Sequence, residues 1–233
     1  MAYNGPKSKN RRYKKKGGKD KQQDRRIRDL EKFVSKTIEN KQVNYSITAT
    51  SINSGGYTTS NFSQITAGPQ DGVNFGDEAR IGNTVTFMKQ TWGLNFVGSS
   101  TDTFNQMRVL IVETVAGNNA LALSDVLHYS NYATFGDNIF SSPYTTKTNT
   151  NKRYKVHYDK TFTLSGLPTK GGCSPTKTIK HVIKWPKGKV IQYQDASNSV
   201  PTNYRMNLFV ISDSVSATHP TMSYNVRTTY KDA

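Results

Sequence analysis

The chain has 233 residues, with 32 Lys or Arg against 16 Asp or Glu and a formal net charge of +16 at pH 7. No run approaches the roughly 18 apolar residues of a membrane-spanning helix, and the polar, basic N-terminus lacks the apolar segment of a signal peptide, so we expect a protein made in the cytosol. The single cysteine, Cys173, excludes an internal disulfide framework and a zinc site built from several thiolates.

Positive charge is concentrated in two segments of the chain. The first 28 residues hold twelve Lys or Arg against two Asp, and residues 147–189 hold eleven basic residues against one acid. Residues 42–146, in contrast, carry three basic residues and seven acids. This separation allows one surface to face phosphates while another faces water or a neighbouring subunit.

Residues 1–23 form a candidate nucleic-acid-binding arm. They mix Gly, Pro, Lys and Arg with almost nothing to bury, which predicts disorder in the unbound chain. A flexible basic segment contacts phosphates without reading base sequence. The candidate phosphate-binding residues, including those of the helix expected next, are Lys7, Lys9, Arg11, Arg12, Lys14, Lys15, Lys16, Lys19, Lys21, Arg25, Arg26, Arg28, Lys32 and Lys36. The alternatives are a solubilising tail or an expression tag, and the basic cluster at 11–16 also matches a nuclear localisation signal.

The pattern of residues 24–40 predicts one amphipathic helix. Apolar residues recur at helical spacing on one stripe, and basic residues cluster on the opposite side. The apolar residues are Ile27, Leu30, Phe33, Val34 and Ile38, and the basic ones are Arg25, Arg28, Lys32 and Lys36. Asp24 is the expected start of the helix and Asn40 its expected end. Either the apolar stripe packs on the chain's own domain, or it docks against neighbouring copies while the cationic side contacts phosphate.

From residue 42 onward, period-two alternation predicts short antiparallel strands. The segments rich in β-branched and aromatic residues are 43–49, Val85–Val97, Met107–Val115, Tyr154–Leu164, Thr178–Trp185, Val190–Tyr193, Tyr204–Ser212 and Ser223–Tyr230. The only other helical signal is short, at Ser124–Tyr129. We therefore expect an all-β fold over residues 42–233, an eight-stranded antiparallel jelly roll of two sheets, preceded by the basic arm and helix over residues 1–41.

Signals for an enzyme or a metal site are weak. The four histidines lack short ligand spacing, and no nucleophile or phosphate-loop motif is present. His157 and Asp159 stand two apart on one predicted strand, but a dyad without a nucleophile is usually incidental. The weak calcium candidates are Asp71, Asp77 and Glu78. The alternative for that segment is a polar loop in which Arg80 pairs with an acid at a subunit contact. We expect no catalytic residues and, at most, calcium as a cofactor.

Several motifs occur in the same order as in a family of small icosahedral coat proteins. The stretch Gly76–Val85, GDEARIGNTV, leads into a long strand with Lys89 and Trp92 and resembles the beginning of a strand in that family. The segments that resemble the next strand, a short loop helix, a second long strand and the closing strand are Met107–Val112, Leu123–Leu127, Arg153–Lys160 and Tyr224–Asp232. The resemblance spans nearly the whole chain. It is closest to the capsid proteins of satellite tobacco necrosis virus and of circular Rep-encoding single-stranded DNA viruses.

This resemblance implies a viral capsid protein. It implies a T=1-like icosahedral shell of on the order of 60 identical copies, with the arms directed inward to a single-stranded genome. Phosphate contacts do not distinguish DNA from RNA, and the resemblance alone favours DNA. The expected location is the virion, with the host cytoplasm or nucleus during assembly, and no membrane partner is expected. The sequence does not identify a host receptor.

The second basic segment is a candidate patch on the inner surface of such a shell. Its residues are Lys180, Lys184, Lys187 and Lys189, which flank His181 and Trp185. Alternation predicts His181, Ile183 and Trp185 on one face of the strand and Lys180, Val182 and Lys184 on the other. The alternatives are an outward receptor or glycan site and an ordinary solvated face.

The leading alternative function is that of a cellular basic protein that binds single-stranded nucleic acid without assembling a shell. Size in solution separates the two, because a capsid protein forms megadalton particles with protected nucleic acid. A trimeric jelly-roll ligand or lectin is a second alternative, which would not need the arm and is expected to carry a secretion signal.

Overall fold

The computed structural model describes residues 21–30, 40–68, 79–99, 104–114, 120–145, 154–165, 176–195, 197–215 and 218–232. The chain divides into two units, Met1–Glu39 and Asn40–Ala233. In the first unit, residues 21–30 form a helix. The second unit contains all of the described strands, so it is the part of the chain that builds a core.

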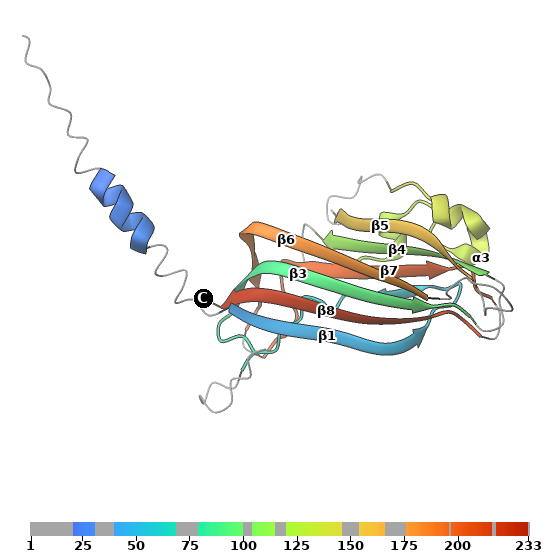
Figure 1. Cartoon of the computed structure of the whole chain (residues 1–233), viewed down its shortest axis with the longest axis horizontal. Coiled ribbons are helices and arrows are strands. Elements are labelled where there is room, and N and C mark those ends of the chain that lie inside the picture. Colours follow the sequence, from blue (N-terminus) through green and yellow to red (C-terminus); the bar gives the residue numbers. More distant parts are fainter. Residues whose placement is uncertain are drawn as a thin grey trace, which may run out of the picture. The chain divides into compact units, whose positions relative to one another are not determined.

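The second unit is a sandwich of two antiparallel sheets (Figure 1). Its strands are β1 (Asn40–Ser51), β2 (Tyr57–Thr59), β3 (Thr84–Val97), β4 (Phe104–Thr114), β5 (Tyr154–Ser165), β6 (Thr176–Gln192), β7 (Arg205–Ser212) and β8 (Thr221–Asp232). The first sheet has the order β1-β8-β3-β6, and the second has the order β2-β7-β4-β5. Every pairing between these strands is antiparallel. The expectation of an all-β sandwich is therefore confirmed.

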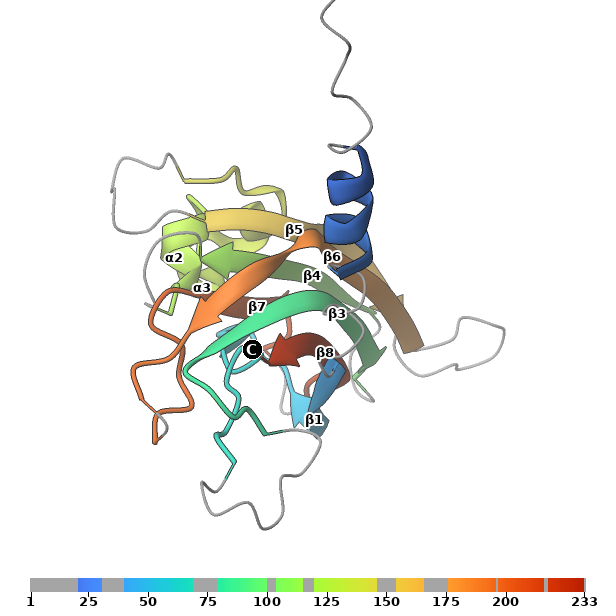
Figure 2. The same ribbon diagram turned by 90° about the vertical axis from the view of Figure 1, so that its left-hand side faces the viewer.

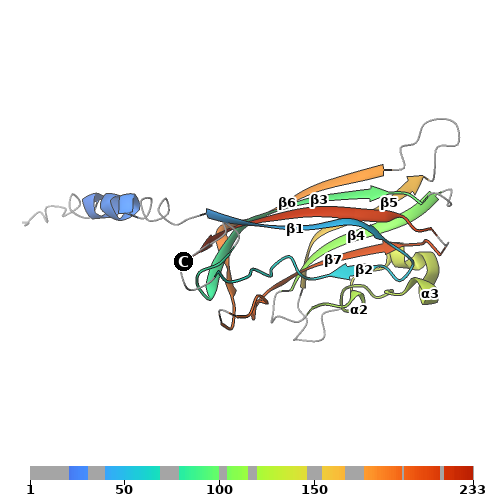
Figure 3. The same ribbon diagram turned by 90° about the horizontal axis from the view of Figure 1, so that it is seen from below.

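The main core lies between the inner faces of the two sheets, which Figure 3 shows as separate layers. Alternation along β3 directs Phe87, Trp92, Leu94 and Phe96 inward, and each is fully buried. Burying a side chain of this size is worth about 1.5–3 kcal/mol, so this strand anchors the sandwich. The indole Nε1 of Trp92 donates to Gln90 Oε1 at 3.1 Å, which satisfies the one polar atom of that ring.

The outer face of the second sheet is covered by the segment between β4 and β5. This segment forms α2 (Leu123–Val126), α3 (Tyr132–Phe135) and a 3₁₀ helix η1 (Gly136–Ser141), which lie beside β4, β5 and β7 in Figure 2. A second apolar cluster joins them to the sheet, because Leu110 and Phe209 from its outer face pack with Leu127 and Ile139. As a result, β4 and β7 are buried on both faces.

Two strand predictions were wrong in detail. Thr178–Trp185 and Val190–Tyr193 were expected to be separate strands, but they belong to one strand, β6, which pairs with β3 on both sides of a bulge. Pro186 and Gly188 only interrupt the pairing, which passes from Lys89↔Lys184 to Phe87↔Lys189. The three-residue strand β2 was not predicted, since three residues are too few to show alternation.

The helix predictions also needed correction. The described helix begins by Lys21, so Asp24 lies inside it rather than at its start, and Asn40 is the first residue of β1 rather than the end of a helix. Of the expected 124–129 segment, only residues 124–126 are α-helical, in the helix α2 that begins at Leu123. The single turn α3 was not predicted, and its signal is local: Asn131 Oδ1 accepts from the backbone N–H of Ala133 at 2.9 Å.

Candidate nucleic-acid interface

The outer face of the first sheet is the open face of the sandwich within the described residues. Its outward positions on β1, β3, β6 and β8 are exposed or half-buried and are mostly polar. Five of them are basic, and we refer to these five as the cationic sheet face. They are Lys89, Lys180, Lys184, Arg227 and Lys231.

Strand register brings these basic residues together from distant parts of the sequence. Lys89 on β3 is the direct partner of Lys184 on β6, and Gly93 on β3 is the partner of Lys180. On the other side of β3, Thr91 is the partner of Arg227 on β8. Neighbouring strands lie about 4.8 Å apart and residues rise about 3.4 Å along each strand, so successive phosphates of an extended nucleic acid can each meet a cation on this surface.

The positive charge of this face is not neutralised by acids on the same strands. The only Asp or Glu in the four strands is Asp232. Its side chain is 4 % exposed, and its Oδ2 accepts from Lys41 Nζ at 3.2 Å and from the backbone N–H of Ile81 at 2.6 Å. Asp232 therefore pairs on the inner side of the sheet, and no acid of these four strands offsets the charge of the cationic sheet face.

The rest of the face consists mainly of hydroxyl and amide groups. These residues are Gln42, Asn44, Ser46, Thr48, Thr91, Asn95, Thr178, Asn225 and Thr229. Some are ordered by contacts with each other, since Arg227 Nε donates to Asn44 Oδ1 at 3.0 Å and Thr178 Oγ1 donates to Asn95 Oδ1 at 3.1 Å. The aromatic residues of the four strands point inward instead. Such a surface can hold phosphates and sugars but offers no ring on which a base could stack.

The structure separates the four lysines of the sequence-predicted patch. Lys180 and Lys184 lie on the outer face with Val182, while His181, Ile183 and Trp185 point inward, so the predicted alternation is confirmed. Lys187 is exposed in the bulge of β6.

Gly188, which completes this bulge, has a φ of +75°, and a Cβ there would lie 2.3 Å from Thr86 Cγ2. A glycine is therefore required for the chain to turn back into register with β3.

Lys189 points to the inner side of β6 and joins a polar cluster at that edge of the sandwich. Its Nζ lies 3.2 Å from Glu113 Oε1 and 5.4 Å from the centre of the Tyr204 ring. Glu113 Oε2 lies 2.6 Å from His157 Nε2. Burial opposes ionisation of Glu113, but the hydrogen bond with His157 and the charge of Lys189 outweigh it and lower the pKa of Glu113. Lys189 thus links the two sheets rather than extending the cationic sheet face.

His157 and Asp159 do not form a dyad. While His157 contacts Glu113, Asp159 receives two hydrogen bonds from Arg108, Nε to Oδ1 at 3.0 Å and Nη2 to Oδ2 at 2.8 Å. Burial raises the pKa of Asp159, but these bonds and the one from Tyr144 reverse the effect and lower it. The two residues therefore serve separate structural ion pairs.

Among the described residues, Arg80 pairs with no acid. Asp71, Asp77 and Glu78 lie outside them, and a pair with an acid of a neighbouring subunit stays a prediction. The Arg80 side chain is fully buried beneath the loops that connect the strands, and it donates to backbone oxygens. Nε donates to Ile65 O at 3.2 Å, and Nη2 donates to Asp195 O at 2.7 Å and to Asn198 O at 2.6 Å. The guanidinium also lies 4.1 Å from the centre of the Tyr193 ring. Arg80 thus holds three loop segments together.

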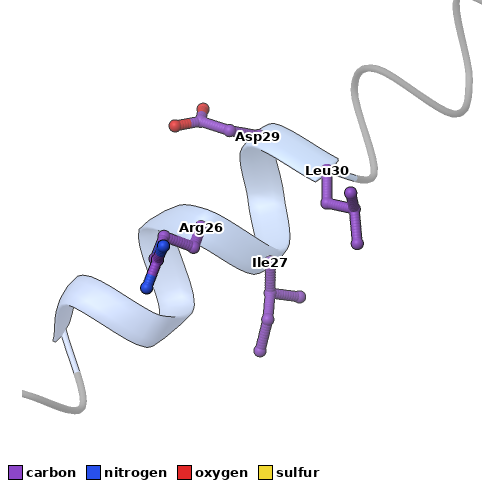
Figure 4. Close-up of a pocket in the computed structure, with 4 residues that line it drawn as sticks. All are labelled: Arg26, Ile27, Asp29 and Leu30. Carbon is purple, nitrogen blue, oxygen red and sulfur yellow. The ribbon is translucent and has the colours of Figure 1, made fainter.

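The helix of the first unit carries three of its basic residues on the side away from its apolar residues, while Arg26 lies beside the apolar residues. Lys21, Arg25 and Arg28 follow one another at intervals of four and three residues, which places them on one side of the helix. Figure 4 shows Ile27 and Leu30 projecting from a common side. These two are 54 % and 64 % exposed, so within the described residues their apolar surface is not buried.

The other predicted site residues lie outside the described residues. These are Lys7, Lys9, Arg11, Arg12, Lys14, Lys15, Lys16, Lys19, Lys32 and Lys36 of the arm and helix, and the calcium candidates Asp71, Asp77 and Glu78. Among the residues that the structure describes, no group of three or more His, Cys, Asp or Glu is placed to hold a metal ion. None of the described helices is long and apolar enough to cross a membrane.

Three residues of the cationic sheet face were missed by sequence reasoning about charge. Lys89, Arg227 and Lys231 are isolated in strands with few charges, so they do not appear as a basic segment. Alternation gave a signal for two of them, because Arg227 follows buried Val226 and Lys231 follows buried Tyr230, so each points away from the core. Lys89 lies at a bulge, between half-buried Met88 and buried Gln90, where alternation gives no such signal. Comparison of the chain with models of known protein families and with curated proteins gave no match.

Proposed function

We propose that this protein is a viral capsid protein that assembles into a closed shell and packages a single-stranded genome. The observation that carries the proposal is the difference between the two outer faces of the sandwich. One is covered by the segment from α2 to η1, whereas the other, as far as the described residues show it, is open, cationic and without exposed acids on its strands. A shell subunit that faces a polyanion on one side needs a cationic surface on that side.

We further propose that the sandwich is a jelly roll. The support is the pairing of strands from opposite ends of the chain: β1 with β8, β2 with β7, β3 with β6 and β4 with β5. This is the pattern of one long antiparallel hairpin that has been rolled up, with the pairings of β3 to β8 and β4 to β7 joining its turns. Eight strands in two such sheets are typical of viral shell domains.

In this proposal, the N-terminal arm and the cationic sheet face both contact the phosphodiester chain. The arm supplies most of the charge, since residues 1–28 carry a net +10 of the chain's +16. On the order of 60 copies would bring roughly a thousand positive charges, comparable to the phosphates of a genome of one to two kilobases. Binding through Lys and Arg to phosphates is strongly salt-dependent and indifferent to base sequence.

The direct test is to express the full chain and measure the size of the purified material by sedimentation and electron microscopy. We expect hollow particles in the megadalton range that protect nucleic acid from external nuclease. Treatment of the extracted nucleic acid with DNase or RNase then shows whether it is DNA or RNA. A monomer or small oligomer that binds single strands under all buffers tested would instead favour a cellular nucleic-acid-binding protein.

A further inference from the structure

The four edge strands of the sandwich differ in how well they are protected against pairing with another chain. An unprotected edge presents a row of free backbone N–H and C=O groups, and natural sheets block it with short strands, Lys, Pro or bulges. In the second sheet, β2 has three residues and β5 carries exposed Lys155 and Lys160. In the first sheet, β6 carries Pro186, a bulge and several exposed lysines.

The edge strand β1 has none of these protections over most of its length. It is 12 residues long, and no described strand pairs with its free side (Figures 1 and 3). Its one charged side chain, Lys41, is 4 % exposed and pairs with Asp232. Its exposed side chains are uncharged, and all but Ala49 are amides or hydroxyls. The register with β8 shifts only after Ile47, so Asn40–Ile47 is a regular edge without an exposed charge.

We propose that this edge binds β1 of a second copy of the chain, antiparallel and across a two-fold axis. Self-pairing is favoured at β1 because no like charges come to lie opposite each other, whereas the lysines of β5 and β6 would do so. With the two-fold axis near Asn44, Tyr45, which points inward and is only partly buried at this border, lies opposite Val43 of the partner and gains cover there. A single eight-stranded sheet across two copies results.

The orientation of the two copies follows from the alternation of side chains. Antiparallel strands in register keep corresponding side chains on the same face, so the cationic sheet faces of both copies lie on one side of the joined sheet. A shell whose inner surface binds nucleic acid through the cationic sheet faces requires this orientation. As a contact between shell subunits, the pairing rests on the proposed function, but it can be tested in material that has not assembled.

A cysteine scan along β1 tests the pairing in the full-length chain with Cys173→Ser as background. When two copies of one strand pair antiparallel, only the residue at the two-fold axis lies opposite the same residue of the other copy. If the segment Asn40–Ile47 pairs with the same segment of a second copy, the axis lies near Asn44. Under mild oxidation we expect disulfide-linked dimers from Asn44→Cys, with yields several-fold lower from Gln42→Cys and Ser46→Cys. The matched control is Asn225→Cys, which is exposed on the same face of β8, one strand in from the edge.

The scan is performed after nuclease treatment at high salt and repeated on assembled particles. Equal yields at all three β1 positions, or at Asn225→Cys, would mean random collision and would overturn the pairing. A second variant, Gln42→Lys with Ser46→Lys, places like charges opposite each other and is expected to abolish the Asn44→Cys dimer. Particles that assemble without the cross-link would refute the β1 pairing but not the capsid function. Cross-linked dimers that never form particles would support the β1 pairing but refute the capsid function.

Discussion

Lys89 of β3 lies directly across from Lys184 of β6, with both side chains exposed on the same face of the first sheet. Like charges in such a cross-strand pair destabilise the isolated sheet. Local conflicts of this kind are expected where a protein binds a ligand that relieves them. An anionic partner relieves this one, because each phosphate that approaches the face screens the repulsion between the two ammonium groups.

The first prediction concerns this pair. In Lys89→Gln with Lys184→Gln, we expect weaker binding of single-stranded oligonucleotides and a fold that is more stable by a few tenths of a kcal/mol. The slope of log affinity against log salt concentration is expected to fall in magnitude by about 0.7 for each phosphate that the variant no longer neutralises. Fluorescence anisotropy over a salt series and urea unfolding measure the two effects.

The matched control for this pair is Lys155→Gln with Lys160→Gln, which removes the same charge from exposed positions of β5 in the other sheet. Its effect on binding should be smaller. If both double variants weaken binding equally, the chain binds through its net charge and the cationic sheet face has no special role.

The second prediction concerns the N-terminal arm. Deletion of residues 2–28 removes twelve basic residues and two acids, and it leaves Asn40–Ala233, which contains the whole sandwich, intact. We expect shells that still assemble but are empty or filled at random, since the main source of phosphate contacts is gone. The ratio of absorbance at 260 and 280 nm of purified particles measures this, and full packaging by the truncated chain would contradict it.

The third prediction concerns Arg80. In Arg80→Met, the carbonyls of Ile65, Asp195 and Asn198 lose their donors inside the protein. The bond to Ile65 O is buried, whereas Asp195 is exposed and Asn198 half-buried, so water can replace the donor at those two carbonyls. With one buried carbonyl left unsatisfied, we expect a loss of about 1–3 kcal/mol in the free energy of unfolding. Urea denaturation measures it. Arg227→Met, at an exposed arginine, should change stability by less than about 0.5 kcal/mol, and a similar small loss at Arg80 would refute its role in holding the loops.

The fourth prediction concerns the stability of the fold at acid pH. The pKa of Glu113 in the folded chain lies below its ordinary value of 4.5, so the unfolded chain takes up this proton more readily. The stability that Glu113 contributes is therefore present above about pH 4.5 and is lost as the pH falls through the folded-state pKa. Urea midpoints measured from pH 6 to pH 3.5 should fall less steeply for Glu113→Gln than for the natural chain.

At pH 6, Glu113→Gln itself should cost about 1–3 kcal/mol, because Lys189 and His157 lose a charged partner. Identical pH profiles for the two chains would show that the acid sensitivity arises elsewhere, for example at Asp159, whose pKa is also lowered.

Much of the sandwich was predictable from the sequence because alternation is a local property. In a strand with one face on the core, the burial of side chains repeats every two residues. Alternation alone therefore correctly predicts that Lys180, Val182 and Lys184 point to the face opposite that of Ile183. The same reasoning failed where local signals mislead or are too short. Pro186 and Gly188 suggested the end of a strand, but pairing with β3 continues beyond them.

The amino-acid sequence alone was sufficient for the all-β class, the cationic N-terminus and the face to which residues of regularly alternating strand segments point, but not for Lys187 and Lys189 at the bulge of β6. Register across the sheets, in contrast, depends on which strands become neighbours, and this is decided by packing between residues far apart in the chain. Only the folded structure places Lys89 between Lys184 on one neighbouring strand and Arg227 on the other, covers one sheet while leaving the other open within the described residues, and leaves β1 at an edge. These relationships depend on long-range contacts, which no local pattern encodes.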